Sequence, residues 1–216
     1  MSAITDRASA VIMLADAKAV RQAVGQGIFI RSAKPDIEIR SADGEIVIPV
    51  SELTASAGGS GVQLSAEKTW TFVGDVAVIE NADAFWRFEL VMPQVDLAVL
   101  SGGNMSTRLV QWLGSPEMAR CRIVHWGDYD PVGVYQYVRL LDACSGRVEA
   151  FAPPEVDELL PKCGKRRLVT RQPKYLDRIR EHAADPFVHR MIELFDKHRR
   201  GLEQEALLHP TVAEVE

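Results

Sequence analysis

Three carboxylates stand at or just after the ends of two expected strands. Glu80 ends the apolar run Asp75-Val-Ala-Val-Ile-Glu80, which is typical of a strand buried on both faces, and Asp128 and Asp130 follow an expected strand at 121–126. In an extended chain, residues two apart point the same way, so Asp128 and Asp130 can face one ion. Carboxylates this close repel one another unless a cation neutralises them, and oxygen-only ligands suit Mg²⁺ or Mn²⁺ rather than zinc. The sequence therefore predicts a Mg²⁺ or Mn²⁺ site at Glu80, Asp128 and Asp130.

Asp130 has a second interpretation, because it stands directly before Pro131 at the expected start of a helix. An aspartate in that position is usually a helix N-cap, and proline is favoured in the first helical turn. Ser101, Gly102 and Gly103 follow another expected strand and precede another expected helix. Backbone amides at such a place can bind a phosphate, so these three residues are a predicted phosphate loop.

The elements that must position these residues alternate between strand and helix. Strands are expected at 75–80, 97–103, 121–126 and 147–151, and helices at 82–92, 105–113 and 131–143. This alternation predicts an α/β fold, with a parallel four-stranded sheet covered by helices on both faces. In such sheets ligands bind at the carboxyl ends of the strands, where Glu80, Asp128 and Asp130 stand.

A small helix-plus-β module is expected before this sheet and a helical extension after it. The module has a predicted helix at 8–24, short strands at 27–31, 37–40 and 45–49, and a glycine-rich connection at 57–61. The predicted division is therefore an N-terminal helix/β module at 1–69, the α/β domain at 70–153 and a helical, basic C-terminal extension at 154–216.

The C-terminal extension concentrates positive charge in a chain whose net charge is −5. Residues 160–200 hold twelve Lys and Arg against five Asp and Glu, a local balance of +7. Clustered basic side chains bind nucleic-acid phosphates without reading base sequence, although solvated amphipathic helices give the same pattern. The candidate DNA-binding residues are Lys165, Arg166, Arg167, Arg171, Lys174, Arg199 and Arg200.

The three cysteines, Cys121, Cys144 and Cys163, lie far apart and form no C-x-x-C pair. An odd number of separated cysteines favours a reducing compartment over a disulfide framework. The N-terminal residues lack the pattern of a signal peptide, and no apolar run is long enough to span a bilayer. We therefore expect a cytoplasmic protein that is not bound to a membrane.

The ordered motifs resemble the Toprim domain of type IIB topoisomerase A subunits, of their meiotic relatives, and of the nuclease subunit of Wadjet-type plasmid-defence systems. The Wadjet group is the nearer match, and the resemblance covers about residues 70 to 208. The motifs that carry it are Val78-Ile-Glu-Asn81, Ser101-Gly-Gly103, Trp126-Gly-Asp-Tyr-Asp-Pro-Val-Gly133 and Leu202-Glu-Gln-Glu205.

This resemblance implies a Toprim fold and Mg²⁺-dependent hydrolysis of DNA phosphodiester bonds, in anti-plasmid or other genome defence. It also implies a homodimer and, for the Wadjet group, a partner that is an SMC-like motor complex. Glu203 and Glu205 of the last motif would complete a second metal position if the C-terminal helix folds back over the site. The alternative for these two residues is an acidic helix end that faces solvent.

Two further functions stay open. Topoisomerase A subunits carry a catalytic tyrosine before the Toprim domain, whereas the first tyrosine here is Tyr129, inside the acidic motif. This favours hydrolysis over strand passage and leaves a topoisomerase-A-like DNA-binding subunit without cleavage activity as one alternative. The other is a non-catalytic Toprim interaction module, which the three intact carboxylates argue against.

Overall fold

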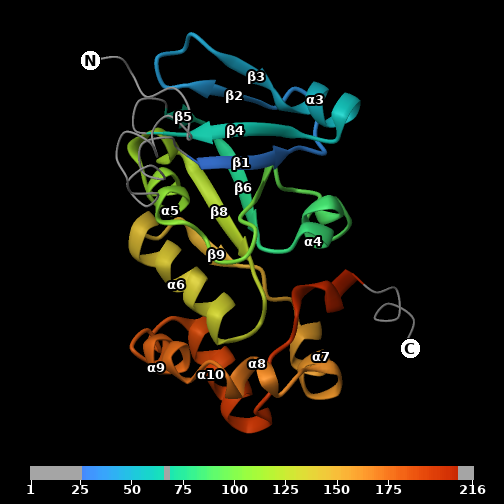
Figure 1. The fold of residues 1–216 in the computed structure, drawn as a ribbon, viewed down its shortest axis with the longest axis vertical. Coiled ribbons are helices and arrows are strands. Elements are labelled where there is room, and N and C mark those ends of the chain that lie inside the picture. Colours follow the sequence, from blue (N-terminus) through green and yellow to red (C-terminus); the bar gives the residue numbers. More distant parts are fainter. Residues whose placement is uncertain (1–25, 66–68, 209–216) are drawn as a thin grey trace, which may run out of the picture.

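The computed structural model describes residues 26–65 and 69–208, so the predicted helix at 8–24 lies outside the described residues. Its centre is a six-stranded sheet with the order β4-β1-β7-β6-β8-β9, drawn in Figure 1. The strands of this sheet are β1 (Gln26–Arg31), β4 (Ser60–Leu64), β6 (Gly74–Ile79), β7 (Leu97–Leu100), β8 (Cys121–Trp126) and β9 (Val148–Ala150).

The four strands β7, β6, β8 and β9 run parallel, as the alternation of strand and helix predicts. Val78 of β6 pairs with Val99 of β7 on one side and with His125 of β8 on the other. The apolar residues of these strands are almost entirely buried, because the sheet is covered on both faces.

The prediction of a sheet with only four strands is wrong, because β1 and β4 extend it with antiparallel pairing. Ile30 of β1 pairs with Val99 of β7, and Val62 of β4 pairs with Ile28. The local sequence does not reveal these contacts, since the paired residues of β1 and β7 lie about seventy positions apart and antiparallel pairing needs no fixed crossover.

The glycine-rich segment at 57–61, predicted as a connection, ends one helix and begins β4. Gly58 caps α3 (Val50–Ala57) in a left-handed conformation, and β4 follows at Ser60. A side chain at Gly59 would lie 2.6 Å from the Phe29 ring and 2.8 Å from the Ile30 carbonyl oxygen. The glycine is therefore needed for the close approach of the chain to β1.

A second, three-stranded antiparallel sheet is built from the remaining strands in the order β3-β2-β5. Its strands β2 and β3 correspond to the predicted strands at 37–40 and 45–49, and Ile39 of β2 is fully buried. The bounds are β2 (Glu38–Ser41), β3 (Val47–Pro49) and β5 (Trp70–Thr71).

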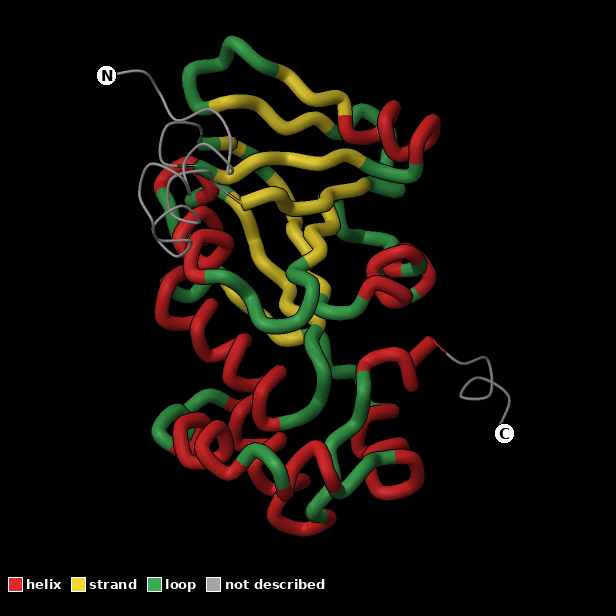
Figure 2. The backbone as a smooth tube through the Cα atoms, viewed as in Figure 1, coloured by secondary structure: helices red, strands yellow, loops and turns green. Residues whose placement is uncertain are grey.

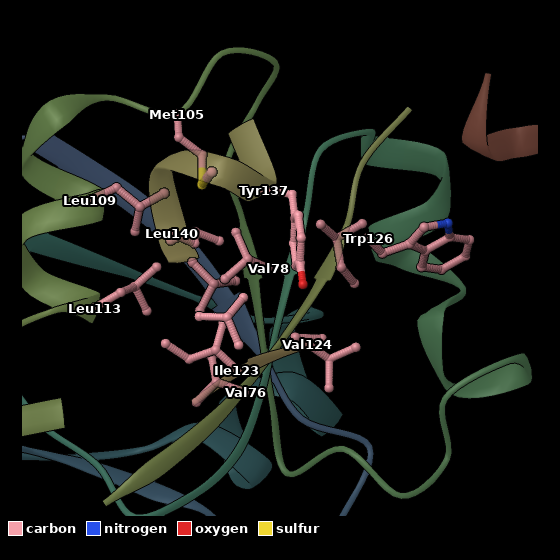
Figure 3. Packing of buried hydrophobic residues seen from close by; sticks show 14 of the residues in the cluster. Val76, Val78, Met105, Leu109, Leu113, Ile123, Val124, Trp126, Tyr137 and Leu140 are labelled. Atoms are coloured by element: carbon pink, nitrogen blue, oxygen red, sulfur yellow. The ribbon is translucent and has the colours of Figure 1, made fainter. Parts of the chain in front are cut away.

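Helices cover the parallel strands from two sides (Figure 1). Figure 3 shows Leu109 and Leu113 of α5 (Thr107–Leu113) and Leu140 of α6 (Pro131–Cys144) on one side of the strands, and Trp126 on the other. The helix predicted at 82–92 is instead a short helix, α4 (Ala82–Trp86), and a 3₁₀ turn, η1 (Phe88–Leu90). Another 3₁₀ turn, η2 (Pro116–Met118), precedes β8.

The C-terminal part is helical, as predicted, and lies at the edge where the parallel strands end (Figure 2). Its elements are α7 (Glu155–Cys163), α8 (Arg167–Thr170), α9 (Pro173–Arg180), α10 (Pro186–His198) and the 3₁₀ turn η3 (Gln204–Leu208). Within 26–65 and 69–208, no helix has the length and apolar character needed to cross a bilayer. The predicted division into three domains stays a prediction.

Candidate metal centre

Glu80 and Asp128 are brought together by the pairing of β6 with β8. Ile79 and Trp126 are the last paired residues, and the Glu80 amide donates to the Trp126 carbonyl at 3.1 Å. The Asp128 amide in turn donates to Oε2 of Glu80 at 3.2 Å. Both residues are partly exposed at the carboxyl edge of the sheet.

Asp130 is the N-cap of α6. Its Oδ1 accepts hydrogen bonds from the amides of Val132 and Gly133, each at 2.9 Å, and its Oδ2 accepts from Nε2 of Gln172 at 3.0 Å. Only 4% of the residue is exposed. The capping role that the sequence allows is therefore present in the structure, and a metal-ligating role for Asp130 stays a prediction.

The segment 201–205 returns from the helical extension to this acidic loop. Leu202 and Tyr129 exchange two backbone hydrogen bonds of 2.8 and 2.9 Å as an isolated antiparallel bridge. The Gln204 amide then donates to Oδ1 of Asp128 at 2.9 Å. Oε1 of the fully buried Gln204 side chain accepts from the Asn81 amide at 3.0 Å. Gln204 therefore connects the two loops that carry Asp128 and Glu80.

Glu203 and Glu205 point to different neighbours. Glu205 accepts a hydrogen bond from Nδ2 of Asn81, the N-cap of α4, beside Glu80. Glu203 forms an ion pair with Lys165, and its Oε1 lies 3.6 Å from the guanidinium of Arg167. The chain does fold back here, but as an extended segment and a 3₁₀ turn rather than as an α-helix.

The carboxyl groups raise one another's proton affinity. Burial raises the pKa of Asp128 to about 7 against the opposing hydrogen bond from Gln204, and the charges of Glu80, Asp130 and Glu205 add to the rise. Burial also raises the pKa of Glu80, and the charges of Asp130 and Glu205 contribute. The pKa of Asp130 is raised by burial too, with the charge of Glu203 contributing. A cation bound among these carboxylates would relieve their repulsion.

This donor set fits a magnesium ion that takes two protein ligands. Among residues 26–65 and 69–208, no three His, Cys, Asp or Glu side chains are placed to hold a metal ion together. Mg²⁺ usually keeps several water ligands and takes only one or two carboxylates, which Glu80 and Asp128 could supply. Nε2 of the Gln204 side chain is buried without a hydrogen-bond partner, so this residue has one donor that the protein does not use.

The loop Ser101–Gly103 braces Glu80 in the structure. The Ser101 amide donates to the Ile79 carbonyl at 2.9 Å, and the Gly103 amide donates to the Glu80 carbonyl at 3.2 Å. Gly102 and Gly103 have φ angles of 67° and 85°, which glycine adopts without strain. Two of the three amides are thus engaged with the end of β6, and a phosphate-binding role for the loop stays a prediction.

The candidate DNA-binding residues lie mostly at the surface of the helical extension. Lys165, Arg166, Arg167, Arg171, Lys174 and Arg199 are exposed. Arg200 is only partly exposed, and its guanidinium donates to the Gly164 carbonyl at 2.8 Å. Of this set, Lys165 and Arg167 are the two that form ion pairs with Glu203 of the returning segment.

Two polar residues, one in β8 and one in the acidic loop that follows it, are packed inside the protein. His125 is buried beside Tyr137, and burial lowers the pKa of its imidazole to about 4. Tyr129 is 1% exposed, and its hydroxyl donates to the Phe151 carbonyl at 2.8 Å. Neither side chain faces the Asp128 carboxylate as an accessible group.

Three amide side chains that sequence reasoning did not single out hold the site: Asn81, Gln172 and Gln204. Each makes a hydrogen bond to a loop that carries one of the carboxylates. Asn81 and Gln204 belong to the motifs that carry the resemblance. Their position next to acidic residues in those motifs could have indicated that they belong to the site. Gln172 has no such signal, because it reaches Asp130 across 42 positions.

Most of the chain matches the model of one known protein family. Residues 60–215 match the family model described as Wadjet protein JetD, C-terminal. No curated protein gives a significant match to the chain. The family match includes both loops of the acidic site and the returning segment 201–205.

Proposed function

The chain belongs to the Wadjet protein JetD C-terminal family, and from this premise we propose that it is a magnesium-dependent endonuclease that hydrolyses DNA phosphodiester bonds in defence against plasmids. The observation that carries the proposal is the contact of Glu80 with the Asp128 loop, at an edge where burial and the charges of neighbouring carboxylates raise the pKa of both carboxyl groups. Perturbed carboxyl groups at the carboxyl edge of an α/β sheet are typical of functional sites.

Glu80 and Asp128 would hold the ion in this mechanism. When bound, Mg²⁺ supplies charge that polarises a phosphate and lowers the pKa of a water molecule. Gln204 fixes the orientation of Asp128 through its backbone amide, as outer hydrogen bonds do for metal ligands generally. We propose that Asp130 serves the same site, by holding the start of α6 and the loop before it.

The exposed basic residues of the helical extension would bind the DNA backbone. The helices of this extension, α8, α9 and α10, lie beyond the ends of the parallel strands in Figure 1, at the edge where Glu80 and Asp128 follow their strands, so DNA bound there would come near the carboxylates. Contacts of this kind are insensitive to base sequence and weaken as salt concentration rises. Binding without sequence preference suits a protein that cuts plasmids of any sequence.

We propose further that the protein acts as a homodimer with an SMC-like motor complex that delivers DNA, as its family implies. Two copies would provide one acidic site for each DNA strand. The non-catalytic alternative has one observation in its favour, because no three ligating side chains are placed together in the described residues. Metal binding and cleavage separate these functions.

The test is incubation of the purified protein with supercoiled plasmid in Mg²⁺ or Mn²⁺, beside the Asp128→Ala variant. Asp142→Ala, on the exposed surface of α6, is the matched control. We expect metal-dependent nicking or linearisation by the wild type and by Asp142→Ala, and none by Asp128→Ala.

The other outcomes distinguish the alternatives. Absence of metal binding in a calorimetric titration of the folded wild type would establish the non-catalytic interaction module. Metal binding and DNA binding without cleavage, with the motor complex also present, would favour the non-cleaving topoisomerase-A-like subunit.

A further inference from the structure

The returning segment lies between the acidic loop and the start of the basic region. Gly201 exchanges backbone hydrogen bonds of 2.7 and 3.2 Å with Lys165, and the next residue, Leu202, pairs with Tyr129 on the other side. The backbones of Lys165 and Tyr129 are therefore separated by roughly two strand spacings, about 10 Å. The packing is tight, since a side chain at Gly201 would lie 2.8 Å from Cβ of Asp130.

Two consecutive residues of this segment, Glu203 and Gln204, contact the protein on opposite sides. Gln204 contacts Asp128 and Asn81, on the side of the carboxylates. Glu203, one position earlier, turns away to Lys165 and Arg167. The two basic side chains thus meet one carboxylate directly beside the acidic loop, and this carboxylate comes from the same segment that orients Asp128.

The contact between Glu203 and the two basic residues is open to solvent. The exposed fractions of the side chains are 36% for Glu203, 46% for Lys165 and 60% for Arg167. Ion pairs this exposed contribute little to stability, so another anion can replace the carboxylate at small cost. A phosphate is the natural replacement, because a guanidinium binds its oxygens in a matching geometry and a lysine supplies a compact charge.

We propose that Lys165 and Arg167 form a subsite for one backbone phosphate of DNA, and that Glu203 occupies this subsite as an internal anion until DNA displaces it. The inference rests on the proposed function in taking DNA as the substrate. It assigns Glu203 to the phosphate subsite rather than to a second metal position.

The test measures binding of a fluorescent DNA duplex by anisotropy in EDTA, where no metal-dependent cleavage occurs. The variants are Glu203→Gln, the double variant Lys165→Ala/Arg167→Ala, and the triple variant that combines them. Glu158→Gln is the matched control, because Glu158 is also exposed and also pairs with a lysine, Lys162. Thermal melts establish that each variant is folded.

Glu203→Gln is expected to bind DNA roughly five-fold more tightly than the wild type at low salt, with a salt dependence of log K steeper by about one unit. Glu158→Gln should bind like the wild type, and the triple variant like the double variant. The inference fails if Glu158→Gln tightens binding equally, if the Glu203→Gln gain persists in the triple variant, or if no form binds DNA.

Cleavage in Mg²⁺ is scored separately. If only Glu203→Gln binds DNA more tightly and the wild type does not cleave plasmid, the phosphate subsite is supported and the proposed nuclease function is rejected. If the wild type cleaves plasmid but Glu203→Gln does not bind DNA more tightly, the nuclease function is supported and the phosphate subsite is rejected.

Discussion

The backbone amide of Gln204 donates to Oδ1 of Asp128 at 2.9 Å, across 76 positions of the chain. The same residue accepts a hydrogen bond from the Asn81 amide through its side chain, next to Glu80. One buried glutamine therefore sets the relative positions of the two loops that carry the principal carboxylates. Substitutions at this residue and around the acidic loop can test that arrangement.

Gln204→Ala is expected to lower both stability and metal affinity. The substitution leaves the Asn81 amide without its acceptor and opens space in a fully buried position, so the free energy of unfolding should fall by about 1–3 kcal/mol. Urea unfolding measures the first effect, and calorimetric titration with Mn²⁺ measures the second. Gln136→Ala is the control, since Gln136 is buried and hydrogen-bonded to Asn104 away from the site. An equal loss of metal affinity in both variants would show that Gln204 contributes only general packing and does not position Asp128.

Gly133→Ala should disrupt the acidic loop. A side chain at Gly133 would lie 2.0 Å from the carbonyl oxygen of Asp128, so the backbone that presents this carboxylate must move. We expect a loss of about 1–3 kcal/mol in stability and at least about ten-fold in plasmid cleavage. Gly61→Ala, where the added methyl group meets nothing within 4 Å, is the comparison. Cleavage by Gly133→Ala at the wild-type rate would show that the loop tolerates this shift.

Substitutions of Asp130 separate its capping role from a ligand role. Asp130→Asn retains an oxygen for the amides of Val132 and Gly133, whereas Asp130→Ala removes the cap and should cost about 0.5–2 kcal/mol. Thermal melts in EDTA compare the two variants. If Asp130 is only a cap, Asp130→Asn keeps most of the cleavage activity; if Asp130 also ligates the metal, that variant loses activity although it stays folded.

Asp128→Asn is expected to stabilise the metal-free protein while removing its response to Mg²⁺. The asparagine keeps the oxygen that accepts from Gln204 but removes one negative charge from the group formed with Glu80, Asp130 and Glu205. The melting temperature in EDTA should therefore rise, and Mg²⁺ should raise it only in the wild type, because a ligand stabilises the state that binds it. A melting temperature in EDTA below that of the wild type would contradict the repulsion inferred here.

Cysteine labelling should be selective for Cys163. This cysteine is exposed, whereas Cys121 and Cys144 are buried. Burial raises the pKa of the Cys121 thiol to about 11 and also raises that of Cys144, so few reactive thiolates form there at neutral pH. N-ethylmaleimide should modify Cys163 in the native protein and all three residues after denaturation, as read by peptide mass spectrometry. Labelling of Cys121 ahead of Cys163 would be inconsistent with this packing.

The local order of residues predicted the centre of the fold and the position of the acidic residues. The parallel strands β6 and β7 are largely apolar runs, and strands alternate with helices along 75–151, so the sequence alone assigned Glu80 and Asp128 to one edge of a sheet. The capping role of Asp130 was predictable because its signal is local to Pro131 and the residues that follow it, and its role as a metal ligand stays a prediction.

The features that the sequence did not reveal depend on contacts between residues that are far apart in the chain. Phe29 of β1 lies beside Leu100, and this register follows from tertiary packing rather than from any local pattern. The amide contacts of Gln172 and Gln204 span 42 and 76 positions. Glu203 and Glu205 look equivalent in the motif, yet they contact different neighbours, because the 3₁₀ turn η3 begins between them, at Gln204.

The contact of Glu205 with Asn81 closes a loop of 124 positions and has a consequence for biosynthesis. On the ribosome, Glu80 and Asp128 emerge well before the segment that connects their loops has left the exit tunnel. A nascent chain therefore presents the carboxylates without the residue that orients Asp128. Assembly of the site is among the last events of folding, so a chain that terminates early carries the acidic residues without the segment that aligns them.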